Sequence, residues 1–317
     1  MEHGPLVLVA LARAFRQRAA WLAAALVTAL LALTAALPYL GGFAGLIEHR
    51  YEPGALVANL DETFRADNRV ALDALSTSAR AVLSVLALVA MLVGAFCAGG
   101  WLTLFHDRLS GNVLARFLGG GARFFGRFVR VWLLTLCLLA LCGWLVYGDA
   151  WVVLVKEGLV GIRDNEEFVS ERSAVTLTWV QDGLYALLFG LVLSWADYTR
   201  TKLALLDGSS AFWAGLESLA LVVAHPVRTL GPLLALIVVE AAGLWLCARV
   251  QLPLERSLDA DAGVGSVLAL AGVGFVALAW RTLVRGARYA ATAETSRELV
   301  PPLPIPDPWS AASRPGA

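Results

Sequence analysis

The sequence predicts an all-α integral membrane protein, a bundle of six spanning helices, and two observations support this fold class. Of the 317 residues, 59% are hydrophobic and only 16% are charged, whereas a soluble domain has roughly 25% charged residues. Six segments are also apolar over the length of about 20 residues that a helix needs to cross a bilayer. We predict spans at residues 21–40, 81–105, 131–147, 174–196, 230–248 and 264–280. Residues 1–300 are expected to form one transmembrane domain, and the proline-rich segment 301–317 a mobile tail.

The charges between the spans predict the orientation of the bundle. Of the 25 Lys and Arg, 16 lie before the first span, after the last span, or in the second and fourth loops, and 9 lie in the other three loops. Of the 25 Asp and Glu, 15 lie in the first, third and fifth loops. Basic residues near span ends are retained in the cytoplasm, so we expect both termini on the cytoplasmic side of a bacterial inner membrane. The first span is longer than the apolar core of a cleaved signal peptide, which favours an uncleaved anchor.

The even-numbered spans end alike, because each has a tryptophan followed five residues later by a basic side chain. The pairs are Trp101 with His106, Trp195 with Arg200, and Trp280 with Arg285. An indole ring at the level of the lipid headgroups, with a hydrated cation beyond it, suits a membrane interface. Two interpretations follow. Either the chain repeats one helical hairpin three times, each copy with a leading elbow helix at the cytoplasmic interface, or unrelated spans have acquired similar anchors.

The second loop contains an arginine-rich segment that we expect to form an elbow helix in the inner headgroup layer. Its arginines recur at steps of 7, 4 and 3, which place them on one helical face. They are Arg116, Arg123, Arg127 and Arg130. This stripe predicts either contacts with anionic lipid headgroups or a topological anchor alone. Gly119, Gly120 and Gly121 are expected to hinge or weaken a continuous helix.

Two acidic residues lie deep within predicted spans, Asp182 in the fourth and Glu240 in the fifth. At 1.5 Å per residue both fall about 12–14 Å below the outer surface, close to the midplane of a core about 30 Å thick. One interpretation is a proton- or cation-handling pair in a transport path. The other is a neutral, hydrogen-bonded pair that holds helices together. Three polar neighbours could accompany them, namely Thr178, Gln181 and Tyr185.

The sequence has no motif for catalysis, metal binding or cofactor binding. The four histidines lie without ligand spacing, and all four cysteines lie within predicted spans. We therefore expect no enzymatic activity, no metal, no cofactor and no nucleic-acid partner. The expected partners are membrane lipids, including anionic lipids, and a membrane protein or a second copy of this chain.

Short motifs at three span ends resemble those of a group of membrane proteins. They are Ala98-Gly99-Gly100, residues 124–130 (FFGRFVR), and Asp197-Tyr198-Thr199-Arg200. The chain resembles a broad group of uncharacterised bacterial six-span membrane proteins, similar in layout to the membrane domain of some glycerophosphoryl diester phosphodiesterases. The resemblance implies an all-helical inner-membrane protein with buried elbow segments. It transfers no active site, and without a counterpart of the soluble phosphodiesterase domain that reaction is not implied.

The fourth span ends with Asp197 and Arg200, which predict either a local salt bridge at the helix end or a contact with a headgroup or partner. For the whole chain, the sequence predicts a non-enzymatic scaffold or accessory subunit that organises lipids or a partner complex in the envelope. The alternative is a small-solute or proton-coupled transporter or channel that uses Asp182 and Glu240.

Overall fold

The computed structural model describes residues 3–47, 66–106, 111–161, 170–208, 210–256 and 264–299, and this part of the chain is helical without strands. Six helices are long and apolar enough to cross a membrane, so the chain is a multi-pass membrane protein. They are α2 (Arg18–Ile47), α5 (Arg69–His106), α6 (Val113–Tyr147), α8 (Glu171–Leu205), α10 (Pro226–Arg256) and α11 (Val264–Leu299). Shorter elements are α1 (His3–Arg16), α7 (Asp149–Trp151), a π-helix η1 (Val152–Val160) and α9 (Ala211–Ala224). The predicted fold class is confirmed, and the predicted tail lies outside the described residues.

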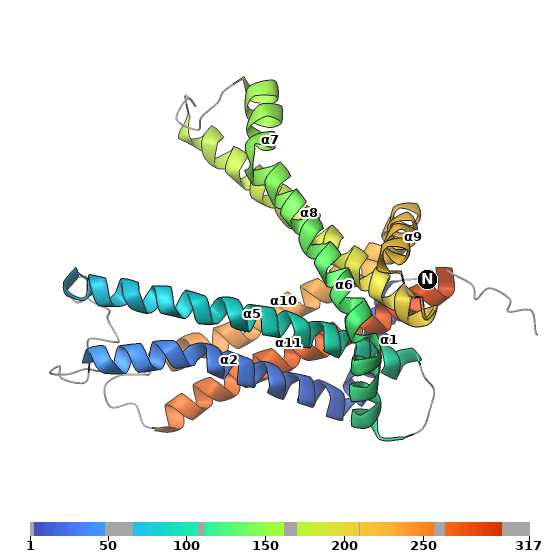
Figure 1. The fold of residues 1–317 in the computed structure, drawn as a ribbon, viewed down its shortest axis with the longest axis horizontal. Coiled ribbons are helices and arrows are strands. Elements are labelled where there is room, and N and C mark those ends of the chain that lie inside the picture. The colour runs from blue at the N-terminus through green and yellow to red at the C-terminus, as the bar shows by residue number, and fades with distance from the viewer. Residues whose placement is uncertain are drawn as a thin grey trace, which may run out of the picture.

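The six long helices meet at one end of the molecule and diverge toward the other (Figure 1). At the end that we call the packed end, α2, α6 and α10 begin and α5, α8 and α11 finish; the opposite end is the open end. α1 and α9 lie at the packed end. The hairpin of α6 and α8, with α7 at its tip, points away from α2, α5, α10 and α11.

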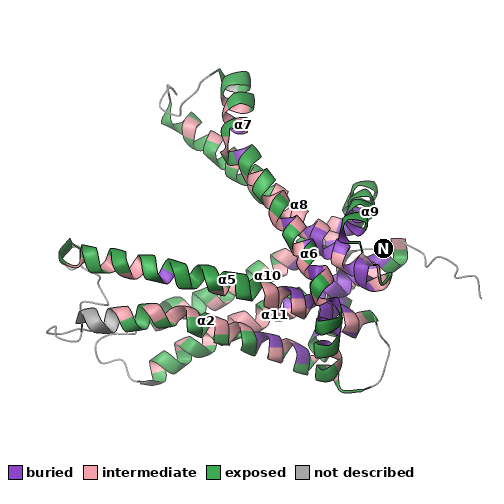
Figure 2. Ribbon diagram, in the orientation of Figure 1, coloured by how far each residue is buried: buried purple, intermediate pink, exposed green. Residues whose placement is uncertain are grey.

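Most buried side chains lie at the packed end (Figure 2). The main cluster contains Trp101 from α5, Phe128 from α6 and Tyr289 from α11, each no more than 3% exposed. The diverging parts of the helices instead leave large apolar side chains uncovered, for example Trp179, which is 74% exposed. Apolar exposure of this kind is unfavourable in water but not in hydrocarbon. All six helices therefore meet at one depth, and their diverging parts leave much of their surface to lipid.

Glycines let α5 and α6 pack backbone against backbone at the packed end. A Cβ added at Gly99 would lie 2.8 Å from the carbonyl oxygen of Gly120 and 3.2 Å from the Cα of Gly121. Small residues of this kind allow the close approach that drives helix association in lipid. We expected the glycines of residues 119–121 to hinge a separate elbow helix, but α6 is continuous from Val113 to Tyr147. The prediction failed because two of these glycines lie in the contact with α5, which holds the segment in helical form.

Three tryptophans, two at the packed end and one near the middle of α11, each pack against a glycine on another helix. The pairs are Trp101 with Gly286, Trp195 with Gly215, and Trp280 with Gly243. The Nε1 of Trp195 also donates a hydrogen bond of 2.7 Å to the carbonyl oxygen of Gly215. Trp101 is only 1% exposed, so its expected place among lipid headgroups is wrong. The absent side chain of each glycine provides space for an indole ring, and these tryptophans join helices together.

Two of the three predicted elbow helices are separate elements at the packed end. α1 precedes α2 with a break at Gln17, and α9 precedes α10 with a break at His225. An ion pair of 2.7 Å between Arg13 and Glu294 joins α1 to α11. The first part of α6 takes the corresponding place before the second pair of spans. This order matches the hairpin unit expected from the sequence, while true threefold repetition stays a prediction.

Candidate functional site

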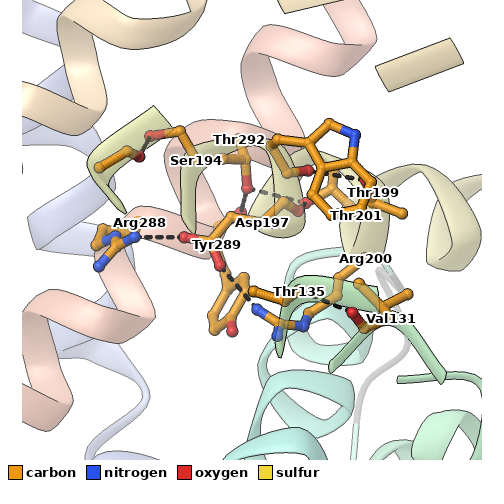
Figure 3. A network of polar contacts seen from close by, with 12 residues as sticks. Val131, Thr135, Ser194, Asp197, Thr199, Arg200, Thr201, Arg288, Tyr289 and Thr292 are labelled. Carbon is orange, nitrogen blue, oxygen red and sulfur yellow. Dashed lines mark hydrogen bonds and ion pairs between the residues drawn. The ribbon is translucent and has the colours of Figure 1, made fainter. Parts of the chain in front are cut away.

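A buried carboxylate, Asp197, lies at the centre of a polar network at the packed end (Figure 3). Its Oδ1 accepts a hydrogen bond of 3.1 Å from Nη1 of Arg200, and its Oδ2 accepts one of 2.6 Å from Nη2 of Arg288. The three side chains are only 8%, 12% and 14% exposed. A buried charge needs a partner and further hydrogen bonds, because leaving water is costly. One carboxylate therefore holds two guanidinium groups and leaves a net positive charge.

The network connects helices that are distant in sequence. Asp197 lies on α8 and Arg288 on α11, so their ion pair joins the two helices. The hydroxyl groups of Thr201 and Thr292 join the same helices at 2.9 Å. On α10 the carbonyl oxygen of Thr229 accepts a hydrogen bond of 2.9 Å from the Tyr198 hydroxyl. Because each bond lies among buried groups, breaking one would leave its partner unsatisfied.

The predicted salt bridge between Asp197 and Arg200 is confirmed, but sequence reasoning missed Arg288. Nothing local could have revealed this partner, which lies 91 residues from Asp197. The Nε atoms of Arg200 and Arg288 are buried without a hydrogen-bond partner among the described residues. Each is a donor on a permanently charged group.

A cavity of about 320 Å³ adjoins this network and lies between α2, α5 and α11. Three guanidinium groups line it, those of Arg200, Arg281 and Arg285. Arg281 contacts Glu240 through Nε at 3.4 Å, whereas no carboxylate of the described residues pairs with Arg285. Tyr289 and Trp101 complete the cationic part of the wall. The cavity therefore combines several fixed positive charges with aromatic and apolar surface.

The structure places the two predicted intramembrane acids in different pairs of helices. Asp182 on α8 accepts a hydrogen bond of 2.8 Å from the Tyr147 hydroxyl on α6. Glu240 on α10 pairs with Arg281 on α11, and its side chain is 19% exposed. Because the hairpin of α6 and α8 diverges from α10 and α11, the structure does not bring the two carboxyl groups together (Figure 1).

Two of the three polar neighbours join the contact between Asp182 and Tyr147. Gln181 donates a hydrogen bond of 2.6 Å to the carbonyl oxygen of Val146. The ring of Tyr185 packs edge-on against that of Tyr147, with centroids 5.1 Å apart. Thr178 instead donates to the Ala174 carbonyl oxygen of its own helix. These contacts hold α6 to α8 within the diverging hairpin.

The arginine stripe of α6 has a partner within the chain. Asp207 follows α8 and forms ion pairs with Arg123 at 3.0 Å and with Arg127 at 2.5 Å. The backbone of Asp207 has a φ of 48°, in the left-handed region that Asp tolerates better than most residues. Arg116 precedes this pair on α6 and is half-buried, and Arg130 follows it and is exposed. Two of the four predicted headgroup contacts thus fix the turn after α8.

Hydrogen bonds from Arg127 and then Arg123 hold the pKa of Asp207 below its ordinary value. With a lowered folded-state pKa, the contact stabilises the fold above the ordinary aspartate pKa and is lost as pH falls through the lowered value. We therefore expect the carboxyl carbon of Asp207 to titrate below the ordinary aspartate range in an NMR experiment on selectively labelled protein. Replacing both arginines with glutamine should return it to the ordinary range. If Asp207 titrates at the same pH in the parent and in the double glutamine variant, this prediction is wrong.

Within the described residues, no three His, Cys, Asp or Glu side chains are placed to hold a metal ion. Comparisons of the chain with protein-family models, with curated proteins and with solved structures found no match. The function is therefore inferred from the residues and their geometry.

Proposed function

We propose that this protein is a non-enzymatic scaffold or accessory subunit of the bacterial inner membrane, where it organises lipids or a partner complex. The distribution of packing supports the proposal most directly. Ion pairs, glycine contacts and buried tryptophans hold the helices at the packed end. The hairpin of α6 and α8 carries apolar side chains outward, with Trp144 56% and Trp179 74% exposed. Such a surface can accept lipid chains or the helices of another membrane protein.

The proposal places the packed end and both termini in the cytoplasm. The basic residues flanking the spans are concentrated at this end, as the positive-inside rule requires. The resemblance of the span-end motifs to those of bacterial six-span membrane proteins supports a location in the inner membrane.

Replacing Trp179 with alanine is expected to release a partner while leaving the fold intact. A central interface tryptophan contributes about 2 kcal/mol or more to binding, equivalent to roughly thirtyfold in affinity. The full chain and the variant would be isolated from native membranes in a lipid-preserving polymer, and bound proteins and lipids quantified by mass spectrometry. Trp245→Ala on α10 is the matched control, since that side chain is 60% exposed. Recovery of the parent with no stable partner and no enriched lipid would refute the scaffold proposal.

Transport remains the second candidate because Arg281, the partner of Glu240, lines the cavity. A proton-coupled transporter requires carboxyl groups that bind and release protons along the path. In proteoliposomes, Asp182→Asn or Glu240→Gln would then abolish pH-dependent solute flux without loss of folded protein. If both variants behave like the parent, the transport hypothesis fails.

A further inference from the structure

We infer that the cavity between α2, α5 and α11 binds the phosphate group of an anionic ligand, with Arg200, Arg281 and Arg285 as its binding residues. The inference deepens the lipid-organising role proposed above and depends on that role only for a lipid as the source of the phosphate. Charge, shape and the position of the cavity along the helices each support it.

The charges around the cavity are unbalanced. Four guanidinium groups gather here, because Arg288 adjoins the three that line the wall. Among the described residues, two carboxylates contact them, those of Asp197 and Glu240. Two positive charges are therefore in excess, one of them on Arg285. A phosphate group carries the charge and the acceptor oxygens that arginine binds in its planar, two-pronged geometry.

At the cationic part of the cavity wall, hydrogen-bond donors lie next to space that a ligand could occupy. The buried Nε of Arg200 has no acceptor among the described residues. Gly94 faces Arg285, since a Cβ added at Gly94 would lie 3.8 Å from Nη1 of that arginine. A glycine at this point of α5 leaves the guanidinium accessible. Arg281 and Arg285 are exposed, so a ligand can approach them from the lipid side.

The remaining wall suits the apolar part of an amphipathic ligand. Leu31, Met91 and Leu278 line the cavity toward the open end. Leu278 and Arg285 lie seven residues apart on α11, or about 10 Å along the helix axis. The volume of about 320 Å³ is at the lower end of the roughly 300–1,000 Å³ found for small-molecule sites. It accommodates a phosphate and the carbons next to it, while acyl chains would lie along the exposed helices.

The position along α11 agrees with a headgroup ligand. Arg281 and Arg285 directly follow the predicted span 264–280, with Trp280 at its end. With the packed end in the cytoplasm, both guanidinium groups lie on the inner side of the midplane, and Arg285 lies one helical turn nearer the inner headgroup layer than Arg281, the partner of Glu240. Anionic lipids of that leaflet attract basic residues at this level.

Binding would be measured on the full chain in uncharged detergent by native mass spectrometry and by ligand-dependent shifts in unfolding temperature. The probes are dioctanoyl phosphatidylglycerol, dioctanoyl phosphatidylcholine and inorganic phosphate. We expect the anionic lipid to bind more tightly than the zwitterionic one, and Arg285→Gln to weaken its binding about tenfold, as expected for loss of a charged hydrogen bond. Gly94→Leu keeps every charge but fills the space before Arg285, and it should weaken binding similarly.

Arg249→Gln is the matched control, because it removes one exposed arginine near the open end of α10, where the guanidinium lies over Trp245. This variant should bind phosphatidylglycerol like the parent. If inorganic phosphate binds and displaces the lipid, the ligand is a free phosphate; if it does not, the ligand is a lipid headgroup. The inference is wrong if neither probe binds the parent, if Arg285→Gln and Gly94→Leu both bind normally, or if Arg249→Gln loses as much affinity. Partner retention through Trp179 is measured separately, so failure of the scaffold proposal and failure of this site are distinguishable.

Discussion

Replacing Asp197 with asparagine is expected to destabilise the folded protein by about 3–5 kcal/mol, the range observed when one partner of a buried ion pair is removed. The carboxylate is 8% exposed and neutralises both Arg200 and Arg288. An asparagine amide of nearly the same shape would leave two guanidinium groups without a negative charge. Unfolding would be followed by tryptophan fluorescence in mixed micelles with increasing denaturing detergent.

Two further variants test whether charge balance causes this loss. Asp73→Asn removes a carboxylate from an exposed position near the start of α5 and should change stability little. Arg288→Gln leaves Asp197 with one partner, Arg200, so its cost should be smaller than that of Asp197→Asn. Equal effects of Asp197→Asn and Asp73→Asn would show that the buried network contributes no net stability.

Substitution of alanine at two glycines is expected to change stability in opposite directions. At Gly99 the new methyl group would lie 2.8 Å from a backbone oxygen of α6, and overpacking of this kind costs about 1–3 kcal/mol. At Gly119 nothing lies within 4 Å of the new Cβ, so alanine should stabilise α6 by about 0.5–1 kcal/mol through its higher helix propensity.

The same unfolding assay compares these two variants directly, and the pair controls for the substitution itself. Each adds one methyl group to a helix at the packed end. If both substitutions stabilise the protein, the contact between α5 and α6 is looser than the structure shows. If both destabilise it, Gly119 is not as open as the structure shows.

The spans could be predicted from the sequence because hydropathy is a property of consecutive residues. Each predicted span lies within one long helix, although the helices extend further, as α6 does from Val113 rather than residue 131. The extensions carry the polar residues that pack at the packed end. A hydropathy threshold excludes such residues, which explains why the helices are longer than the predicted spans.

The partners of the polar residues could not be predicted in the same way. Depth along a helix placed Asp182 and Glu240 at one level, but sequence spacing does not report the lateral distance between helices. Tyr147 and Arg281 are their separate partners. Arg200 on α8 and Arg285 on α11 likewise line one cavity. They lie close together because glycines and tryptophans determine how these helices pack, which sequence spacing does not reveal.

The α6–α8 hairpin meets the other long helices mainly at the packed end, so a small rotation there would move its far tip furthest. α8 has 35 residues, which corresponds to a rod about 50 Å long. Asp197, where α8 joins α11, lies 26 residues or about 39 Å from the far end of α8 at Glu171, so a tilt of about 5° there would move that end by roughly 3 Å. A small rotation that leaves the ion pairs of Asp197 intact would thus move the tip of the hairpin further than any residue near Asp197. The α6–α8 hairpin would then rotate about the buried ion pairs of Asp197 with Arg200 and Arg288.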